Sequence, residues 1–130
     1  LGVFPSGDGV AGGDYVSQFT VTNPIVIGPT LPQIQAVVFT PKCASCHNGV
    51  GAVLPGVLNL TSEAASLASL VNVPSIQNAA LDRVEPGQPN NSYLVHKIDG
   101  TAATQMPPTG PLPQAEVDAI IQWITDGALP

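Results

Sequence analysis

Residues 43–47 read Cys-Ala-Ser-Cys-His, and this C-x-x-C-H spacing is typical of a c-type haem attachment site. Two thiols at this spacing can each form a thioether with one vinyl-derived arm of the same porphyrin, and the imidazole that follows then lies under the iron. The sequence therefore predicts one covalently bound haem c, attached through Cys43 and Cys46 with His47 as an iron ligand. The rest of the chain must then fold around this cofactor.

Other uses of the two cysteines explain the sequence less well. A structural zinc site takes four nitrogen or sulfur ligands, and the sequence offers His96 as the one further histidine beside Cys43, Cys46 and His47, at an unusual separation. A thioredoxin-like redox pair lies within a βαβ pattern, which this sequence does not show. A disulfide between the two cysteines would close too small a loop to add much stability and would leave His47 unexplained.

The second axial position of the iron has two candidate ligands. Electron carriers close this position with methionine or a second histidine, whereas haem proteins that act on oxygen or peroxide leave it open. A lone methionine is often a flexible core filler, but Met106 lies in a proline-rich stretch, and prolines stiffen a loop by fixing φ. We therefore predict iron ligation by Met106, with His96 as the rival ligand and an ordinary, partly exposed histidine as the default at position 96.

Three further motifs accompany the attachment site: GQPNNSYLVHKI at 87–98, QMPP at 105–108 and IIQWITDGA at 120–128. Together these motifs resemble those of a class I monohaem cytochrome c, in particular the cytochrome c modules of secreted or outer-surface bacterial proteins. The resemblance covers residues 31–130. It implies a small all-α fold around a covalent haem, His47 as proximal and Met106 as distal ligand, one-electron transfer rather than catalysis, and haem attachment outside the cytoplasmic membrane.

The composition of the 130 residues limits the partners. Nine acidic and three basic side chains give a net charge of −6, which disfavours binding to nucleic acid or to an anionic membrane. A redox partner with a basic docking face is the natural complement. The sequence has no apolar run long enough to span a membrane, and no signal peptide opens it, so we expect Leu1 to be a processed end. Because the resemblance implies haem attachment outside the cytoplasmic membrane, we expect the protein to be periplasmic or extracellular.

The chain divides by composition into an N-terminal extension, residues 1–30, and a haem domain, residues 31–130. Residues 14–23 alternate apolar and polar side chains and predict one β-strand, followed by a linker rich in proline and glycine. A single strand cannot satisfy its own backbone. It is therefore expected to pair with the haem domain, with an upstream domain, or with a second copy of the chain.

Helical periodicity predicts four helices in the haem domain. The first begins at Pro32, with an apolar stripe of Ile34, Val37 and Val38 that leads to Cys43 and is expected to pack against the last helix. The second helix is capped by Thr61 or Ser62 and has an apolar stripe of Leu67, Leu70 and Val71. The third covers residues 93–98. The fourth runs from Pro113 to about Asp126, with an apolar stripe of Val117, Ile120, Ile121 and Ile124.

Several other side chains have predicted roles near the haem. Tyr93 and Trp123 are expected to bind the cofactor, Tyr93 through a propionate and Trp123 at the rim. The resemblance also implies a backbone carbonyl near Pro55 that accepts the ring N–H of His47 and so fixes its tautomer. Lys42 and Lys97 are candidates for docking or for pairing with propionates, although solvated surface lysines are the more common case.

Three functions remain open from the sequence. The leading prediction is one-electron transfer by a His47/Met106 haem, because no catalytic carboxylate pair or activated nucleophile is visible. A peroxidase-like or gas-binding haem domain is the enzymatic alternative and would need an open distal site. The third prediction is an assembling electron carrier that uses the strand at 14–23 to form a filament or a tether.

Overall fold

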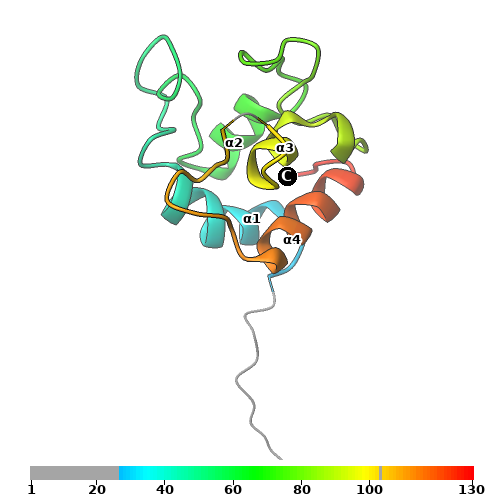
Figure 1. Cartoon of the computed structure of the whole chain (residues 1–130). Coiled ribbons are helices and arrows are strands. Elements are labelled where there is room, and N and C mark those ends of the chain that lie inside the picture. Colours follow the sequence, from blue (N-terminus) through cyan, green and yellow to red (C-terminus); the bar gives the residue numbers. More distant parts are fainter. Residues whose placement is uncertain (1–26, 103) are drawn as a thin grey trace, which may run out of the picture.

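The computed structural model describes residues 27–102 and 104–130, and within them the chain is helical, which confirms the predicted all-α class (Figure 1). The elements in chain order are α1 (Leu31–Ile34), the π-helix η2 (Gln35–Cys43), α2 (Glu63–Leu70), the short 3₁₀ helix η3 (Pro89–Asn91), α3 (Tyr93–Ile98) and α4 (Gln114–Thr125). In this described part, β pairing is limited to isolated bridges such as the one between Asn48 and Asn59. The predicted strand at 14–23 lies outside the described residues.

The first helix differs from its prediction in winding. It begins as α-helix at Leu31 and continues as π-helix through Cys43, and the amide of Ala44 donates to the carbonyl of Phe39 over 2.8 Å. The wider π turn changes which residues share a face. Ile34 and Val38 are buried as predicted, Val37 is only half-buried, and the buried face also includes Leu31, Gln35 and Phe39.

Gln35 is a buried polar side chain with its hydrogen bonds satisfied. Its Nε2 donates to the carbonyl of Leu60 at 2.8 Å and to the hydroxyl of Thr40 at 2.9 Å, while Ser66 donates to its Oε1 at 2.6 Å. A buried amide costs free energy unless it is paired in this way. These bonds tie η2 to α2 and to the end of the segment that follows His47.

The remaining helices begin within one or two residues of the positions that the sequence predicts, and α3 and α4 also end as predicted. Ser62 caps α2 by accepting from the amide of Ala65 at 3.2 Å, and Ser92 precedes α3. Pro113 precedes α4, and the chain leaves this helix through Gly127, whose φ of 110° suits glycine.

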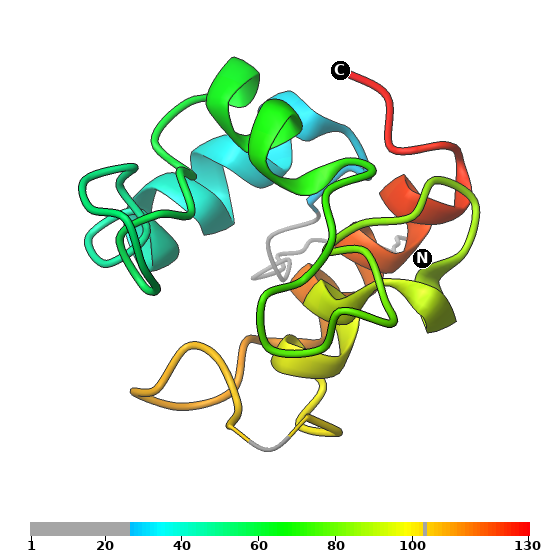
Figure 2. The ribbon, with the colours of Figure 1, turned by 90° about the horizontal axis from the view of Figure 1, so that it is seen from above.

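The helices pack around one apolar core. Helix α4 packs against both α1 and α3, as predicted for the first and last helices (Figure 1). Figure 2 shows the segments 48–60 and 104–112 on the same side of the molecule, away from the end of α4 that leads to the C-terminus. None of the helices in the described residues is both long and apolar enough to cross a membrane.

Candidate haem site

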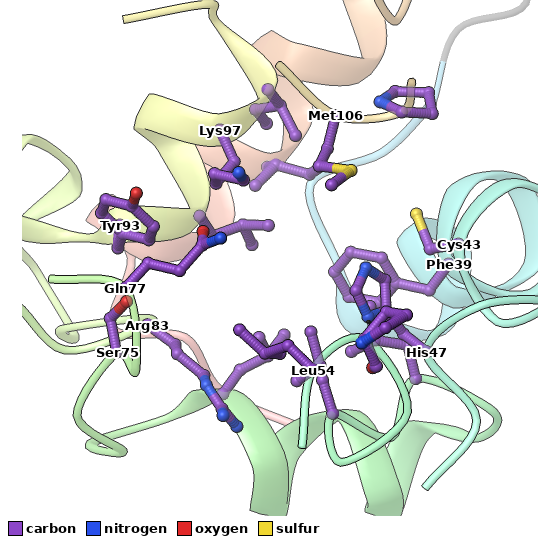
Figure 3. Close-up of a pocket in the computed structure, with 18 of the residues that line it drawn as sticks. Phe39, Cys43, His47, Leu54, Ser75, Gln77, Arg83, Tyr93, Lys97 and Met106 are labelled. Carbon is purple, nitrogen blue, oxygen red and sulfur yellow. Dashed lines mark hydrogen bonds between the residues drawn. The ribbon is translucent and has the colours of Figure 1, made fainter. Parts of the chain in front are cut away.

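A cavity of about 370 Å³ lies between η2, α3, α4 and the loops that follow His47 and α3. Its volume is within the range of small-molecule sites. Most of its wall is apolar, formed by Val38, Phe39, Leu54, Pro55, Leu58, Leu60, Leu70, Ile76, Leu94, Ile98, Pro107, Leu112 and Ile120. Cys43, His47 and Met106, three of the predicted haem-binding residues, also line it (Figure 3).

The attachment motif forms a tight turn at the end of η2. The amides of Cys46 and His47 both donate to the carbonyl of Cys43, at 3.2 and 2.9 Å. Cys43 faces the cavity, whereas Cys46 is exposed and does not line it. Both thiols are free, so the cysteines are not joined to each other.

Burial raises the pKa of the Cys43 thiol to about 11, although the ammonium of Lys42 opposes this rise. A reactive redox cysteine has a lowered pKa, because the thiolate is the nucleophile. The thiol of Cys43 is therefore not activated as a nucleophile by its surroundings.

The imidazole of His47 is oriented by the backbone. Its Nδ1 lies 2.8 Å from the carbonyl oxygen of Pro55. A carbonyl can only accept, so Nδ1 carries the proton and Nε2 is left with its lone pair free for a metal. This is the hydrogen bond that the sequence predicts for a carbonyl near Pro55.

Met106 reaches the cavity from a different wall. Its amide donates to the carbonyl of Lys97 over 2.8 Å, which anchors the methionine to the end of α3. In Figure 3 the sulfur of Met106 lies on the upper side of the cavity and His47 on the lower right. The two predicted axial ligands thus lie in one apolar cavity.

One side of the cavity is polar. Arg83, Lys97, Tyr93, Gln77 and Ser75 line it, and Figure 3 shows Tyr93, Gln77, Ser75 and Arg83 on the side opposite Cys43 and His47. Burial lowers the pKa of both Arg83 and Lys97, so both cations are partly withdrawn from water. Two cations and three polar groups in the wall of an otherwise apolar cavity are suited to carboxylates on an otherwise apolar ligand.

These features together fit haem c. A porphyrin carries its thioether-forming arms and its two propionates on different halves of the ring, and the cavity has cysteine at one side and cations at the other. Sequence analysis did not identify Ser75, Gln77 and Arg83. The available signal was that Arg83 is the single arginine in a chain with three basic residues.

The ring of His96 is engaged outside this cavity. Its Nε2 lies 2.8 Å from the carbonyl oxygen of Asn90, and its Nδ1 lies 2.7 Å from the hydroxyl of Thr101. Because both ring nitrogens are occupied, the geometry does not support His96 as an iron ligand. Within residues 27–102 and 104–130, no three His, Cys, Asp or Glu side chains gather as a metal site, so the four zinc donors considered above do not converge.

Trp123 and Lys42 are not among the residues that line the cavity. Trp123 is 2% exposed and packs in the core without lining the cavity, and its indole N–H donates to the carbonyl of Leu129 over 2.7 Å. Its neighbour on the helix, Ile120, faces the cavity instead. Lys42 is paired with Glu116 on α4, with its ammonium 2.7 and 2.9 Å from the two carboxylate oxygens.

Comparison with known proteins identifies the family. Residues 31–124 match the model of the family described as cytochrome c oxidase, cbb3-type, subunit III. No match was found among curated proteins or among solved structures. The family match covers most of the chain, including the attachment motif, Met106 and α4, and the predicted resemblance is confirmed. The chain therefore belongs to the cytochrome c oxidase cbb3-type subunit III family and carries a class I c-type cytochrome domain.

Proposed function

We propose that this chain is a one-electron carrier with a single haem c, attached through Cys43 and Cys46 and ligated by His47 and Met106. The observation that carries this proposal is the presence of His47 and Met106 in one apolar cavity. Membership of the family brings haem-based electron transfer, a covalently bound haem c and redox partner proteins. When bound, the haem supplies an iron couple that takes up and releases one electron.

The chain's own residues restrain the His47 ring and the backbone of Met106, the two proposed ligands. The Pro55 carbonyl fixes the His47 ring, and the Lys97 carbonyl fixes the backbone of Met106. Pre-positioned ligands lose little conformational freedom when a metal binds between them. A site closed on both sides supports electron transfer over oxygen or peroxide chemistry, which needs an open position.

The polar side of the cavity would hold the propionates. The Arg83 guanidinium is itself positioned, because one of its amino groups donates to the carbonyl of Ser69 over 2.9 Å. Lys97 lies with its ammonium 6.0 Å from the centre of the Tyr93 ring. Arg83, Lys97 and the phenol of Tyr93 all line the cavity, and cations of this kind would compensate anionic groups in a site of reduced polarity.

The net charge of −6 suits a redox partner with a basic docking face, and we infer a location outside the cytoplasmic membrane, periplasmic or extracellular. Positively charged partners meet this acidic protein faster at low ionic strength, and negatively charged partners meet it more slowly. Rates of reduction by a basic and by an acidic small redox protein, compared at two salt concentrations, test this part of the proposal. The basic partner is expected to reduce the protein faster than the acidic partner at low salt. This difference in rate is expected to shrink as salt is added.

The optical spectrum of the holoprotein tests the proposed ligation. We expect low-spin spectra in both oxidation states, a weak near-infrared sulfur-to-iron band in the oxidised form, and no binding of carbon monoxide to the reduced form. High-spin features together with rapid binding of carbon monoxide would instead identify a peroxidase-like or gas-binding domain.

A further inference from the structure

Ser75 is a buried serine with an unused hydrogen-bond donor. The residue is 4% exposed and lines the candidate haem cavity (Figure 3). Its Oγ accepts from the amide of Asn78 at 3.2 Å. Within residues 27–102 and 104–130, no acceptor for the hydroxyl proton lies within hydrogen-bonding distance. Because a buried donor without an acceptor costs free energy, the hydroxyl is suited to an acceptor on the ligand of the cavity.

Two paired segments, 73–75 and 81–83, place Ser75 near Arg83. Pro74 and Asp82 form an antiparallel bridge, which is flanked by two backbone hydrogen bonds of 2.9 and 2.7 Å. Ser75 and Arg83 donate these two bonds, each from the position that follows a bridged residue. Since successive side chains of extended segments alternate between two faces, Ser75 and Arg83 share the face opposite to Pro74 and Asp82. They occupy diagonal positions on it, a separation that a long side chain can span.

The guanidinium of Arg83 has donors to spare. One of its amino groups donates to the carbonyl of Ser69 over 2.9 Å, and a guanidinium has five N–H donors in all. Arg83 lines the same cavity as Ser75. A carboxylate accepts several hydrogen bonds through its two oxygens, so a hydroxyl and a guanidinium on one face can bind the same carboxylate.

We propose that Ser75 is a haem-binding residue, whose hydroxyl donates to the same propionate carboxylate that Arg83 binds. This inference rests on the proposed function, because it takes the ligand of the cavity to be haem c. Arg83 supplies the opposite charge, and Ser75 supplies a second, directional donor. The paired segments 73–75 and 81–83 thereby present a neutral donor and a cation to one anionic group.

Resonance Raman spectroscopy of the reduced holoprotein tests the proposal, because the frequency of the propionate bending band rises when the carboxylate accepts hydrogen bonds. Ser75→Ala removes the hydroxyl, and we expect the propionate band to shift to lower frequency. Ser75→Thr retains a hydroxyl and is expected to return the band toward its position in the unaltered protein. An unchanged propionate band in Ser75→Ala would overturn the inference.

The matched control is Ser66→Ala. Ser66 is also a buried serine, but it does not line the cavity, and its hydroxyl donates to Oε1 of Gln35 at 2.6 Å. This variant also loses a buried hydrogen bond, so we expect it to be less stable while its propionate band stays in place. An equal shift in Ser66→Ala and Ser75→Ala would show that the band follows a general loss of packing, which would count against Ser75 as a haem-binding residue.

If Ser75→Ala yields no holoprotein, nuclear magnetic resonance of the unaltered reduced holoprotein decides. We expect a slowly exchanging hydroxyl proton of Ser75, with a nuclear Overhauser effect to a propionate methylene group of the haem. A hydroxyl proton of Ser75 that exchanges rapidly with water, or that lies close to protein protons alone, would overturn the proposal.

The optical spectrum separates this inference from the proposed function. If the holoprotein is low-spin with the near-infrared band, and Ser75→Ala leaves the propionate band unmoved, the electron carrier stands and only the role of Ser75 fails. If the holoprotein is high-spin and binds carbon monoxide, but Ser75→Ala shifts the propionate band, the role of Ser75 stands and the proposed function fails. An intact mass without attached haem would overturn both.

Discussion

The Nδ1 atom of His47 lies 2.8 Å from the carbonyl oxygen of Pro55, eight residues further along the chain. Residues 48–54, which lie between them in the sequence, bring the carbonyl of Pro55 back to the His47 ring. The amide of Leu60 closes the same segment by donating to the carbonyl of His47 at 2.8 Å. The orientation of the proximal imidazole thus depends on the shape of residues 48–60.

Gly56 is the residue that this shape tolerates least, because a Cβ atom there would overlap the carbonyl oxygen of Val50. We predict that Gly56→Ala lowers the free energy of unfolding of the holoprotein by about 1–3 kcal/mol and alters the visible spectrum, since the Pro55 carbonyl must shift. Val53→Ala in the same loop, at a side chain that is 73% exposed, is expected to stay within about 0.5 kcal/mol of the parent. Equal effects of the two variants in denaturant titrations would contradict the account.

Arg83 is expected to set part of the reduction potential. A cation beside the cavity disfavours the oxidised iron, which carries one more positive charge, so Arg83→Gln should lower the potential by an amount on the order of 1 kcal/mol in redox free energy. Arg83→Lys keeps the charge and should recover most of the shift. Potentiometric titration measures the reduction potential of both variants. The same potential in the two variants and in the unaltered protein would show that the charge of Arg83 does not influence the iron.

Lys42 and Glu116 join η2 to α4 through a half-buried ion pair, with side-chain exposures of 34% and 12%. Glu116→Gln leaves the ammonium of Lys42 without its counter-charge close to Cys43. We predict a loss of about 1–2 kcal/mol in the free energy of unfolding, between the values typical of surface and buried pairs. A double variant with both residues made neutral should be less destabilised than the sum of the two single variants, and simple additivity would show that the pair is not coupled.

Trp123→Phe separates stability from cofactor binding. The variant loses the hydrogen bond from the indole to the carbonyl of Leu129 and part of a buried side chain, so we expect a loss of about 1–3 kcal/mol in the free energy of unfolding. Because Trp123 does not line the cavity, the visible spectrum and the reduction potential should be unchanged. A clear spectral change would restore the prediction that Trp123 lies at the haem rim.

The features that depend on local chemistry could be predicted from the sequence. The attachment motif is defined by spacing within five residues, and helices α2, α3 and α4 are marked by capping residues and by proline or glycine at their ends. The carbonyl partner of His47 was predicted from the resemblance to class I cytochromes c and not from the spacing of prolines and glycines, and the hydrogen bond to Pro55 confirms it.

The features that depend on packing could not be predicted. The π-helical winding of η2 has no periodic signature in a short segment, so the burial of Phe39 and the only partial burial of Val37 were missed. Arg83 reaches the cavity from a loop without periodicity, and only the assembled fold brings it near Tyr93 and Lys97. For Trp123, the helical period defines a buried face but does not say which part of that face meets the cavity.

Iron K-edge X-ray absorption of the oxidised holoprotein tests the central claim most directly, because it reports which atoms are bonded to the metal. The account predicts one sulfur in the first coordination shell beside the nitrogens of the porphyrin and of His47, and loss of that sulfur in Met106→Leu. A first shell composed of nitrogen alone in the unaltered protein, or a sulfur signal that survives in Met106→Leu, would contradict ligation by Met106.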